Sequence, residues 1–270
     1  MDAWSNPAQA PLAVISGASS GLGAALARAY AARGWRLVLA GRRAGALDQV
    51  AQDCAAEQGL QVVDPSRLRL IELDLRDTEG WRGHSARLLR EWGCPQLVIA
   101  CAGISRGVDL AHAQDLEVAG AIMQTNWLAA LGTLSLFIAP MCARGSGTLV
   151  GIASVAGVRG LPGHAAYSAS KAALITSLES LRVELRPRGV RVLTISPGFV
   201  DTPMNAGSPF AMPFLLDSAR FARRAMRAID GGRSYATIPW QMALLSKLLH
   251  VLPRAAWDRA LRRRPRKPRG

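Results

Sequence analysis

Short apolar runs alternate with longer segments of helical periodicity along most of the chain. Apolar runs bounded by turn residues are typical of buried strands, and apolar spacings of three and four residues are typical of helices. The segments predicted to be strands are 12–16, 36–40, 68–73, 97–100, 148–152, 191–195 and 234–239. The clearest predicted helices are 22–33, 46–58, 78–92 and 166–185. This alternation indicates βαβ units and a parallel sheet covered by helices.

The pattern contains no internal repeat and no linker, so we predict one domain over residues 1–253. Its fold class is α/β: a single Rossmann-type, doubly wound parallel sheet of about seven strands with helices on both faces. With 50% hydrophobic residues, the chain can build a substantial core. Ligands of such sheets bind beyond the carboxyl ends of the strands, so chemically active residues are expected directly after strands.

The positive charge of the chain is concentrated near its C-terminal end. The formal net charge is +14, and residues 254–270 hold eight basic residues and one acidic residue, a net +7. This distribution predicts a local basic C-terminal tail over 254–270 instead of a general nucleic-acid-binding surface. The tail also lacks the interleaved aromatic residues of nucleic-acid-binding segments, so no nucleic acid partner is expected.

Four cysteines, Cys54, Cys94, Cys101 and Cys142, show no C-x-x-C pair and no metal-ligand spacing. We therefore expect reduced thiols in a cytoplasmic protein and no metal site. Residues 1–11 lack a basic region followed by an apolar stretch, so no signal peptide is expected.

A glycine-rich turn, residues 16–23 with the sequence S-G-A-S-S-G-L-G, follows the first predicted strand and precedes an alanine-rich helix. Glycines allow a tight turn and let a pyrophosphate approach the backbone, while N–H groups at the helix start attract the anion. The alternative is a plain strand–turn–helix connection, which the position directly after the first strand disfavours. The predicted cofactor-binding residues of this turn are Gly17, Ser19, Ser20, Gly21, Leu22 and Gly23.

The second predicted strand is followed by Arg42 and Arg43, with no carboxylate at that point. A site for NAD typically holds a carboxylate there to bind the ribose hydroxyls, whereas NADP requires cations for its 2′-phosphate. We predict NADP(H), with Arg42 as the main phosphate contact and Arg43 stacking on adenine. The alternative is a pair of solvated surface arginines.

Two further pairs follow the third and fourth predicted strands. Asp74, followed by Leu75, is placed to accept a hydrogen bond from the adenine amino group, and Ala102 and Gly103 are small enough for the cofactor to pack against the backbone. Each pair has an ordinary alternative, a solvated carboxylate or a packing glycine.

Tyr167 and Lys171 lie four residues apart on a predicted helix, so their side chains share one face. A tyrosine, whose unperturbed pKa is about 10, needs a nearby cation to exchange a proton near neutral pH. Ser154 follows the strand predicted at 148–152 and can donate a hydrogen bond to a substrate oxygen. Together with the glycine-rich turn, these residues form a candidate catalytic set.

With these motifs, residues 11–236 resemble the short-chain dehydrogenase/reductase family. The resemblance implies that Tyr167 is the general acid in reduction and the base in oxidation. It implies that Lys171 lowers the tyrosine pKa and binds the nicotinamide ribose, and that Ser154 positions the carbonyl.

The same resemblance extends to two segments outside this set. Asn126 matches the family's helix asparagine, which holds a water in a proton relay to the lysine. The sequence 197–202, P-G-F-V-D-T, matches the segment that meets the nicotinamide carboxamide, through Val200 and Thr202.

Two departures from the family pattern are visible. The family commonly has N-N-A-G after the fourth strand, where this chain has Ala100, Cys101, Ala102 and Gly103. Loss of both asparagines removes side-chain hydrogen bonds that brace the sheet. The opening threonine of the family is Ser16 here, which keeps the hydroxyl.

The segment after Thr202 contains prolines, methionines, phenylalanines and leucines, which indicates an apolar, adaptable substrate lid over about 203–230. We therefore expect a hydrophobic carbonyl substrate. Core closure or an oligomer contact would explain the same residues. His164 is placed to line the mouth of the pocket, with a surface role as the alternative.

Residues 238–261 form an apolar stretch that is too interrupted by polar residues to span a bilayer. Because tryptophan and leucine stand beside arginines, we expect peripheral contact with an anionic membrane surface. The alternative is a helix that packs in a homo-oligomer, with a solvated tail. Homo-oligomerisation is expected, and the expected location is the cytoplasm or the inner face of a membrane.

These features lead to one functional hypothesis and one rival. The chain is expected to be an NADP(H)-dependent oxidoreductase that interconverts a ketone and a secondary alcohol, on an apolar or lipid-like substrate. The rival is a non-catalytic NADP(H)-binding regulator or scaffold, which would have no need of a tyrosine with a lowered pKa.

Overall fold

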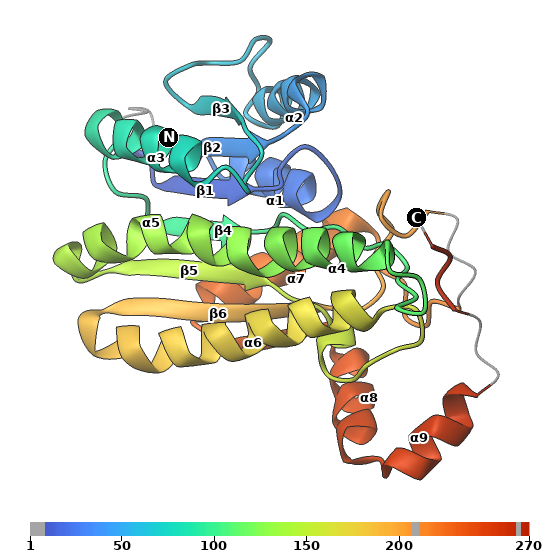
Figure 1. Ribbon diagram of the computed structural model, residues 1–270. Helices are drawn as coiled ribbons and strands as arrows, with labels where there is room; N and C mark the ends of the chain where they lie inside the picture. The colour runs from blue at the N-terminus through green and yellow to red at the C-terminus, as the bar shows by residue number, and fades with distance from the viewer. Residues whose placement is uncertain (1–8, 207–210, 263–265, 270) are drawn as a thin grey trace.

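A computed structural model of the chain describes residues 9–206, 211–262 and 266–269. In these residues, seven parallel strands form one sheet in the order β3-β2-β1-β4-β5-β6-β7 (Figure 1). The strands are β1 (Leu12–Ser16), β2 (Arg36–Gly41), β3 (Leu68–Glu72), β4 (Leu97–Ala100), β5 (Gly147–Ile152), β6 (Val190–Pro197) and β7 (Tyr235–Ile238). The predicted fold class is confirmed, and each predicted strand is present.

Helices connect the strands and cover both faces of the sheet. They are α1 (Gly21–Ala31), α2 (Ala44–Glu57), α3 (Thr78–Glu91), α4 (Asp115–Met123), α5 (Ala129–Arg144), α6 (Ala165–Leu185), α7 (Ser218–Asp230), α8 (Trp240–Val251) and α9 (Arg254–Leu261). Short helical turns are η2 (Gln124–Leu128), η3 (Val155–Gly157) and η4 (Arg186–Arg188).

Successive side chains of a strand point to opposite faces of the sheet, and helices cover both faces, so the sheet is buried on both sides. In β1, Ala13 and Ile15 pack in one core cluster with α1, α2 and α7, whereas Leu12 and Val14 pack in another with α3, α5 and α6. All five residues of β1 are buried. A near-continuous apolar run in the sequence therefore marks a strand covered on both faces.

Residues 115–144 form one helical rod made of α4, η2 and α5. Its length, and the mean hydropathy of 1.5 of an 18-residue window within it, would also suit a membrane-spanning helix. Here the rod lies along the sheet, and Leu134, Phe137 and Met141 are fully buried in the core between the rod, the sheet and α6 (Figure 1). The rod is thus a core helix of this fold.

The predicted lid is shorter than expected, because its second half is part of the core. Residues 218–230 form α7, which Asp217 caps by accepting a hydrogen bond from the Arg220 amide at 2.6 Å. Phe221, Ala222 and Ala225 are fully buried in the cluster shared with α1. Within the predicted lid, residues 207–210 lie outside the described residues, and a lid role for the other residues before α7 stays a prediction.

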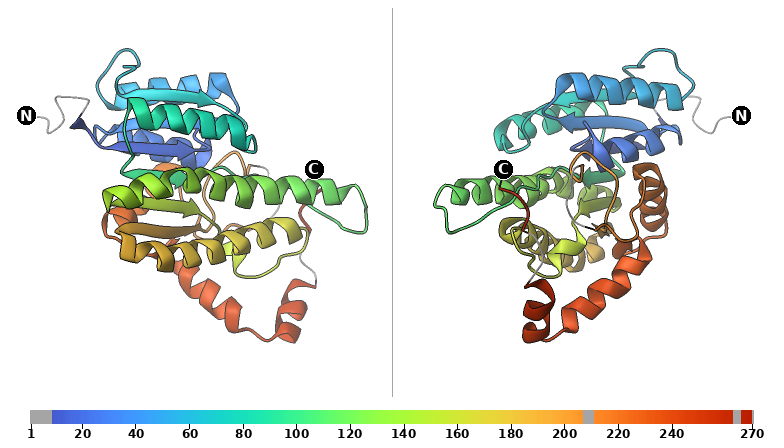
Figure 2. Two further views of the ribbon diagram at one scale, coloured as in Figure 1. Left: turned by 60° about the vertical axis from the view of Figure 1, so that its left-hand side comes forward. Right: turned by 90° about the vertical axis from the view of Figure 1, so that its right-hand side faces the viewer.

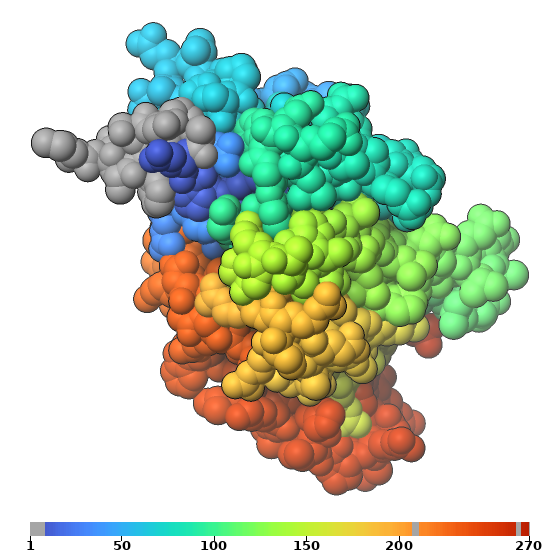
Figure 3. Space-filling model, turned by 90° about the vertical axis from the view of Figure 1, so that its left-hand side faces the viewer, coloured from blue at the N-terminus to red at the C-terminus, as the bar shows by residue number. Residues whose placement is uncertain are grey.

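The C-terminal residues also depart from the expected solvated tail. Residues 254–261 form α9, and the described residues 266–269 return to the loops at the carboxyl ends of the strands. Figure 2 shows the C-terminal end beside the start of the green α4 rod. In the space-filling view, the red-orange C-terminal helices form the lower edge of the molecule, below α6 (Figure 3). The boundary predicted at residue 253 therefore does not separate the tail from the domain in space.

Candidate active site

The strand order reverses between β1 and β4, and a cavity of about 910 Å³ opens beyond the carboxyl ends of the strands. Loops after β1, β2, β4, β5 and β6 contribute to its wall. Every predicted site residue except Asn126 lines this cavity. From the predicted cofactor set these are Gly17, Ser19, Ser20, Gly21, Leu22, Gly23, Arg42, Arg43, Asp74, Leu75, Ala102, Gly103, Tyr167, Lys171, Val200 and Thr202. Tyr167 and Lys171 also belong to the predicted catalytic set, from which Ser154 lines the cavity too.

The glycine-rich turn is packed so closely that side chains are excluded at two positions. Gly17 has a φ of +67°, and a Cβ there would lie 2.6 Å from the backbone of Ala102. A Cβ on Gly23 would collide with the carbonyl oxygen of Gly17. The turn runs into α1, whose first N–H groups have no partner within the helix. This backbone cradle fits the pyrophosphate of a dinucleotide.

The two arginines after β2 take different positions at the cavity. Arg43 extends over the glycine-rich turn, where its Nη2 donates to Ser20 Oγ at 2.7 Å and to Ser19 Oγ at 3.2 Å. Arg42 is exposed, and its Nη1 lies 3.9 Å from Asp74 Oδ2. Both guanidinium groups line one end of the cavity and supply positive charge for a phosphate there.

Asp74 is held ionised by its neighbours. The Arg76 guanidinium donates to both carboxylate oxygens, at 2.6 Å for the shortest contact, and these hydrogen bonds lower the pKa of Asp74 to about 2. An ionised carboxylate at this point accepts hydrogen bonds, which is the property required for binding an adenine amino group.

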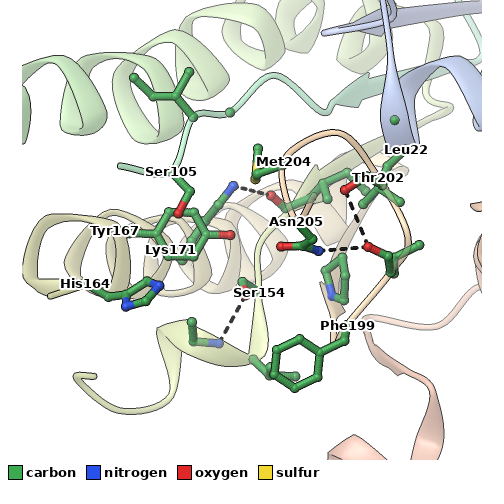
Figure 4. Close-up of a pocket in the computed structure, with 18 of the residues that line it drawn as sticks. Leu22, Ser105, Ser154, His164, Tyr167, Lys171, Phe199, Thr202, Met204 and Asn205 are labelled. Carbon is green, nitrogen blue, oxygen red and sulfur yellow. Dashed lines mark hydrogen bonds between the residues drawn. The ribbon is translucent and has the colours of Figure 1, made fainter. Parts of the chain in front are cut away.

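Tyr167 lies near the start of α6 with Ser154 facing it from the end of β5 (Figure 4). Burial raises the pKa of the Tyr167 phenol, and the Ser154 hydroxyl opposes this rise by hydrogen bonding. Ser154 Oγ also accepts from the Ala156 amide at 3.1 Å, so the hydroxyl can donate its proton either to the phenol oxygen or to a ligand. The site therefore holds a protonated phenol and a hydroxyl donor side by side.

Lys171 follows Tyr167 by one helical turn on α6. Its Nζ lies 5.9 Å from the centre of the Tyr167 ring and donates to the Ile152 carbonyl at 2.8 Å. Burial lowers the pKa of Lys171 to about 8. Burial raises the pKa of the Tyr167 phenol, and the lowering of that pKa by Lys171 stays a prediction.

Asn126 is fully buried behind the cavity wall, in a turn of π-helix between α4 and α5. Its side-chain amide accepts from the Ile104 amide at 2.7 Å, and donates to the Ile104 carbonyl at 2.9 Å and to Ser170 Oγ at 3.0 Å. Turns of π-helix often occur at functional sites. In the structure Asn126 fixes the backbone that follows Gly103, and the expected water relay stays a prediction.

The departures from the family pattern after β4 keep the sheet braced. The Ser16 hydroxyl accepts a hydrogen bond from the Cys101 amide at 3.2 Å and so ties the end of β1 to the end of β4. The Cys101 thiol, near Lys171, has its pKa raised to about 12 by burial, so the thiol is not a nucleophile near neutral pH.

The loop after β6 closes over the glycine-rich turn. A Cβ on Gly21 would lie 3.5 Å from the Thr202 side chain, and the Val200 carbonyl accepts from Asn205 Nδ2 at 2.8 Å and from Thr202 Oγ1 at 3.4 Å. Figure 4 shows these contacts together on one side of the cavity. Asn205 has no counterpart in the sequence prediction, where it stood among apolar lid residues.

Further residues from α6, α8 and α9 and the loops before them complete the wall of the cavity. His164 lies beside Tyr167, with ring centroids 6.2 Å apart, and lines the cavity. This position agrees with the predicted place at the pocket and not with a purely surface role. The helices α8 and α9 add an apolar wall, which includes Met242, Leu245, Leu249 and Trp257. Part of the apolar stretch attributed to membrane or oligomer contact therefore faces the cavity.

Comparisons with known proteins agree with this geometry. The short chain dehydrogenase family matches residues 11–210. An uncharacterised oxidoreductase of Myxococcus xanthus is 42% identical over 251 residues, which cover 93% of this chain and 96% of that protein. The chain belongs to the short-chain dehydrogenase/reductase family.

Solved structures of this family have the same fold. A short-chain dehydrogenase of Burkholderia cenocepacia in complex with NADP superposes with a TM-score of 0.76 at 27% identity, over 94% of this chain and 98% of that one. An alcohol dehydrogenase of the archaeon Thermococcus sibiricus, complexed with 5-hydroxy-NADP, gives a TM-score of 0.73 at 25% identity over 85% and 96%. The chain is thus an oxidoreductase of the short-chain dehydrogenase/reductase family.

Proposed function

We propose that this short-chain dehydrogenase/reductase interconverts a ketone and a secondary alcohol with NADP(H). The observation that carries the proposal is the convergence of Tyr167, Ser154 and Lys171 with the glycine-rich turn on one cavity. NADP complexes of the Burkholderia and Thermococcus relatives support the cofactor. The bound cofactor supplies or accepts the hydride at the substrate carbon.

The residues of the chain supply the proton and hold the carbonyl. Because burial raises the pKa of Tyr167, the phenol stays protonated at neutral pH and can donate its proton to the carbonyl oxygen during reduction. The Ser154 hydroxyl can donate to the same oxygen. Lys171, with a pKa of about 8, remains largely protonated at neutral pH and compensates negative charge that forms on the phenol oxygen.

The walls of the cavity support an apolar substrate. Val155, Phe199 and Met204 face the site from the loops, and α8 and α9 add leucines and Trp257. An apolar ketone would be desolvated against these side chains, while one polar centre, formed by Ser154 and Tyr167, would fix its carbonyl.

Turnover of NADPH against a panel of ketones tests the proposal. We expect NADPH oxidation with apolar ketones and slower turnover with sugars. A protein that binds NADPH tightly but oxidises it with no member of a broad panel would instead support the regulator or scaffold hypothesis.

The choice of NADPH over NADH is expected to depend on Arg42 or Arg43. Each guanidinium–phosphate contact is worth about 1.5–3 kcal/mol, so Arg42→Ala should weaken NADPH binding about tenfold to a hundredfold and leave NADH binding unchanged. Calorimetric titration of both cofactors measures this. Arg82→Ala, on the exposed face of α3, is the matched control. An unchanged preference in Arg42→Ala would transfer the phosphate contact to Arg43, which lies over the turn.

We also propose that the outer face of α8 contacts an anionic membrane surface. Trp240, Leu244, Leu248 and Val251 are between 59 and 74% exposed and repeat at helical spacing. The exposed Lys247 and Arg254 lie beside this stripe in the sequence. An apolar face flanked by cations is typical of interfacial helices. The cytoplasmic location, at the inner face of a membrane, and homo-oligomerisation remain predictions.

Flotation with vesicles tests the membrane contact. We expect the protein to float with phosphatidylglycerol-containing vesicles and the double variant Leu244→Gln/Leu248→Gln to float several-fold less. The control is Val62→Gln/Val183→Gln, which changes two equally exposed side chains elsewhere. If the α8 variant floats as well as the native protein but has a smaller mass by light scattering, the stripe packs against a second copy instead.

A further inference from the structure

The described residues 266–269, here called the strap, are tied to loops around the active site by charged contacts. Arg266 pairs with Asp109 at 3.0 Å, and Arg269 pairs with the largely buried Asp115 at 2.7 Å. Gly107 forms a parallel bridge with Arg269. The strap thus has partners between the end of β4 and the first residue of α4, although these lie more than a hundred residues away in the chain.

Two glycines allow the strap to lie directly on these loops. A Cβ on Gly107 would collide with the carbonyl oxygen of Pro268, and a Cβ on Gly163 would lie 2.7 Å from the backbone nitrogen of Lys267. Gly107 belongs to the loop after β4, and Gly163 lies just before α6, which carries Tyr167. The strap therefore crosses both loops that flank the catalytic tyrosine.

Lys267 is the strap residue whose charge faces the cavity. Its Nζ donates to Ser105 Oγ at 2.7 Å, and both residues line the cavity. Figure 4 shows Ser105 beside Tyr167. Among the described residues, Lys267 has no carboxylate within salt-bridge distance, in contrast to the paired Arg266 and Arg269. Its half-buried ammonium is compensated by a neutral hydroxyl, and burial lowers its pKa.

A partly desolvated cation that lacks a counterion gains free energy when an anion enters. The other cations at the cavity are accounted for differently. Lys171 is buried beside Tyr167, donates to the Ile152 carbonyl and is assigned to the phenol oxygen in the proposed reaction. Arg42 and Arg43 lie at the glycine-rich turn, and Arg159 donates to the Leu249 and Leu252 carbonyls and stacks on Trp257. Arg106 is exposed at the rim. The apolar wall of α8 and α9 and the half-buried Lys267 ammonium are thus complementary to a ligand with an apolar body and one anionic group.

We propose that Lys267 is a specificity-determining residue that pairs with an anionic group, such as a carboxylate, on an otherwise apolar carbonyl substrate. The proposal rests on the proposed carbonyl chemistry and names the substrate class for the same site. It assigns the basic C-terminal segment a function in substrate recognition that its sequence alone does not indicate.

Kinetics with charge-matched substrates test the assignment. The probes are oxo-octanoates with the ketone at the third, fifth or seventh carbon, and their methyl esters. We expect the native protein to prefer at least one acid over its ester. In Lys267→Gln, kcat/KM for that acid should fall about tenfold or more, mainly through KM, with the ester unchanged, because a charged hydrogen bond is worth about 1.5–3 kcal/mol. Lys267→Arg should restore part of the preference.

Arg188→Gln is the matched control, since it removes the charge of an exposed cation in η4, outside the cavity. It should leave the preference for the acid unchanged. Equal kcat/KM for acids and esters in the native protein would overturn the role of Lys267 while leaving the ketone reductase function intact. The same conclusion would follow if Lys267→Gln kept the native preference.

Binding separates this proposal from the proposed function. Calorimetry with octanoate and octanamide on the NADP⁺-saturated protein requires no turnover. We expect octanoate to bind more tightly than octanamide in the native protein and equally in Lys267→Gln. This result without any ketone turnover would retain Lys267 as an anion-binding residue and reject the ketone chemistry. Equal affinities in the native protein would overturn the proposal.

Discussion

Replacing Tyr167 by phenylalanine should lower kcat for ketone reduction by about 10²- to 10⁴-fold, the range that a positioned general acid contributes. The substitution removes the proton donor and leaves the ring, which packs beside His164. NADPH affinity should change little, because the glycine-rich turn and the arginines after β2 keep their contacts. Stopped-flow or steady-state oxidation of NADPH, with calorimetry for its binding, measures both quantities.

The matched control for this experiment is Tyr235→Phe. Tyr235 lies at the start of β7, where its hydroxyl bonds with Ser196 Oγ at 2.7 Å, and it does not line the cavity. Loss of that hydroxyl should leave kcat within about twofold of the native value, since surface substitutions away from the site have small effects. If Tyr167→Phe kept most of the native turnover, another group would have to supply the proton and the catalytic assignment would be wrong.

The raised pKa of Tyr167 also predicts how the rates of reduction and oxidation depend on pH. The phenol is the acid in reduction and burial raises its pKa, so titration of the phenol should not slow reduction near neutral pH. Reduction should slow above about pH 8, where Lys171 loses the charge that compensates the phenol oxygen. Oxidation needs the deprotonated phenol and should rise with pH over the same range. The expectation from sequence, a tyrosine pKa lowered by Lys171, would place both changes closer to neutral pH.

The sheet and most of the site could be predicted because short sequence patterns indicate each of their elements. Apolar runs mark strands that are buried on both faces, and parallel strands bring their carboxyl ends to one edge. The glycine-rich turn follows β1, Ser154 follows β5 and Tyr167 lies in the first turn of α6, so they converge once the strand order is known. The prediction of the site is strong because parallel strands all end at one edge of the sheet, which brings together residues that are far apart in the chain.

Contacts without a local pattern could not be predicted. Lys267 meets Ser105 across 162 residues of sequence, and only the path of the chain after α8 brings them together. The basic composition of the last residues predicted a solvated or membrane-bound tail. The sequence does not show that Arg266 and Arg269 form ion pairs with Asp109 and Asp115. Similarly, residues 218–230 contain many arginines, yet Phe221 and Ala225 form a narrow apolar stripe that packs on α1.

The positions of the two arginines after β2 illustrate the same limit at short range. Sequence places both at the end of the strand, but side-chain direction alternates along an extended backbone. Arg43 therefore extends over the glycine-rich turn and bonds Ser19 and Ser20, while Arg42 points toward Asp74. A pattern can predict that a cation is present without predicting which of two neighbours approaches the phosphate.

Replacing Gly17 by alanine should lower the free energy of unfolding by about 2 kcal/mol or more and strongly weaken NADPH binding. A residue with a side chain loses about 1–2 kcal/mol at a positive φ, here +67°, and overpacking against the Ala102 backbone adds about 1–3 kcal/mol. The turn can relieve the contact only by moving away from the end of β4, which would open the pyrophosphate cradle.

Gly120→Ala is the opposite case in the same chain and serves as the control. Gly120 lies on the exposed face of α4, and a Cβ there would have nothing within 4 Å. Alanine should therefore stabilise the protein by up to about 1 kcal/mol through helix propensity alone. Urea unfolding of both variants, with NADPH titration of each, measures the contrast. If Gly17→Ala unfolded like the native protein and bound NADPH equally well, the close approach of the turn to β4 would not be what shapes the phosphate site.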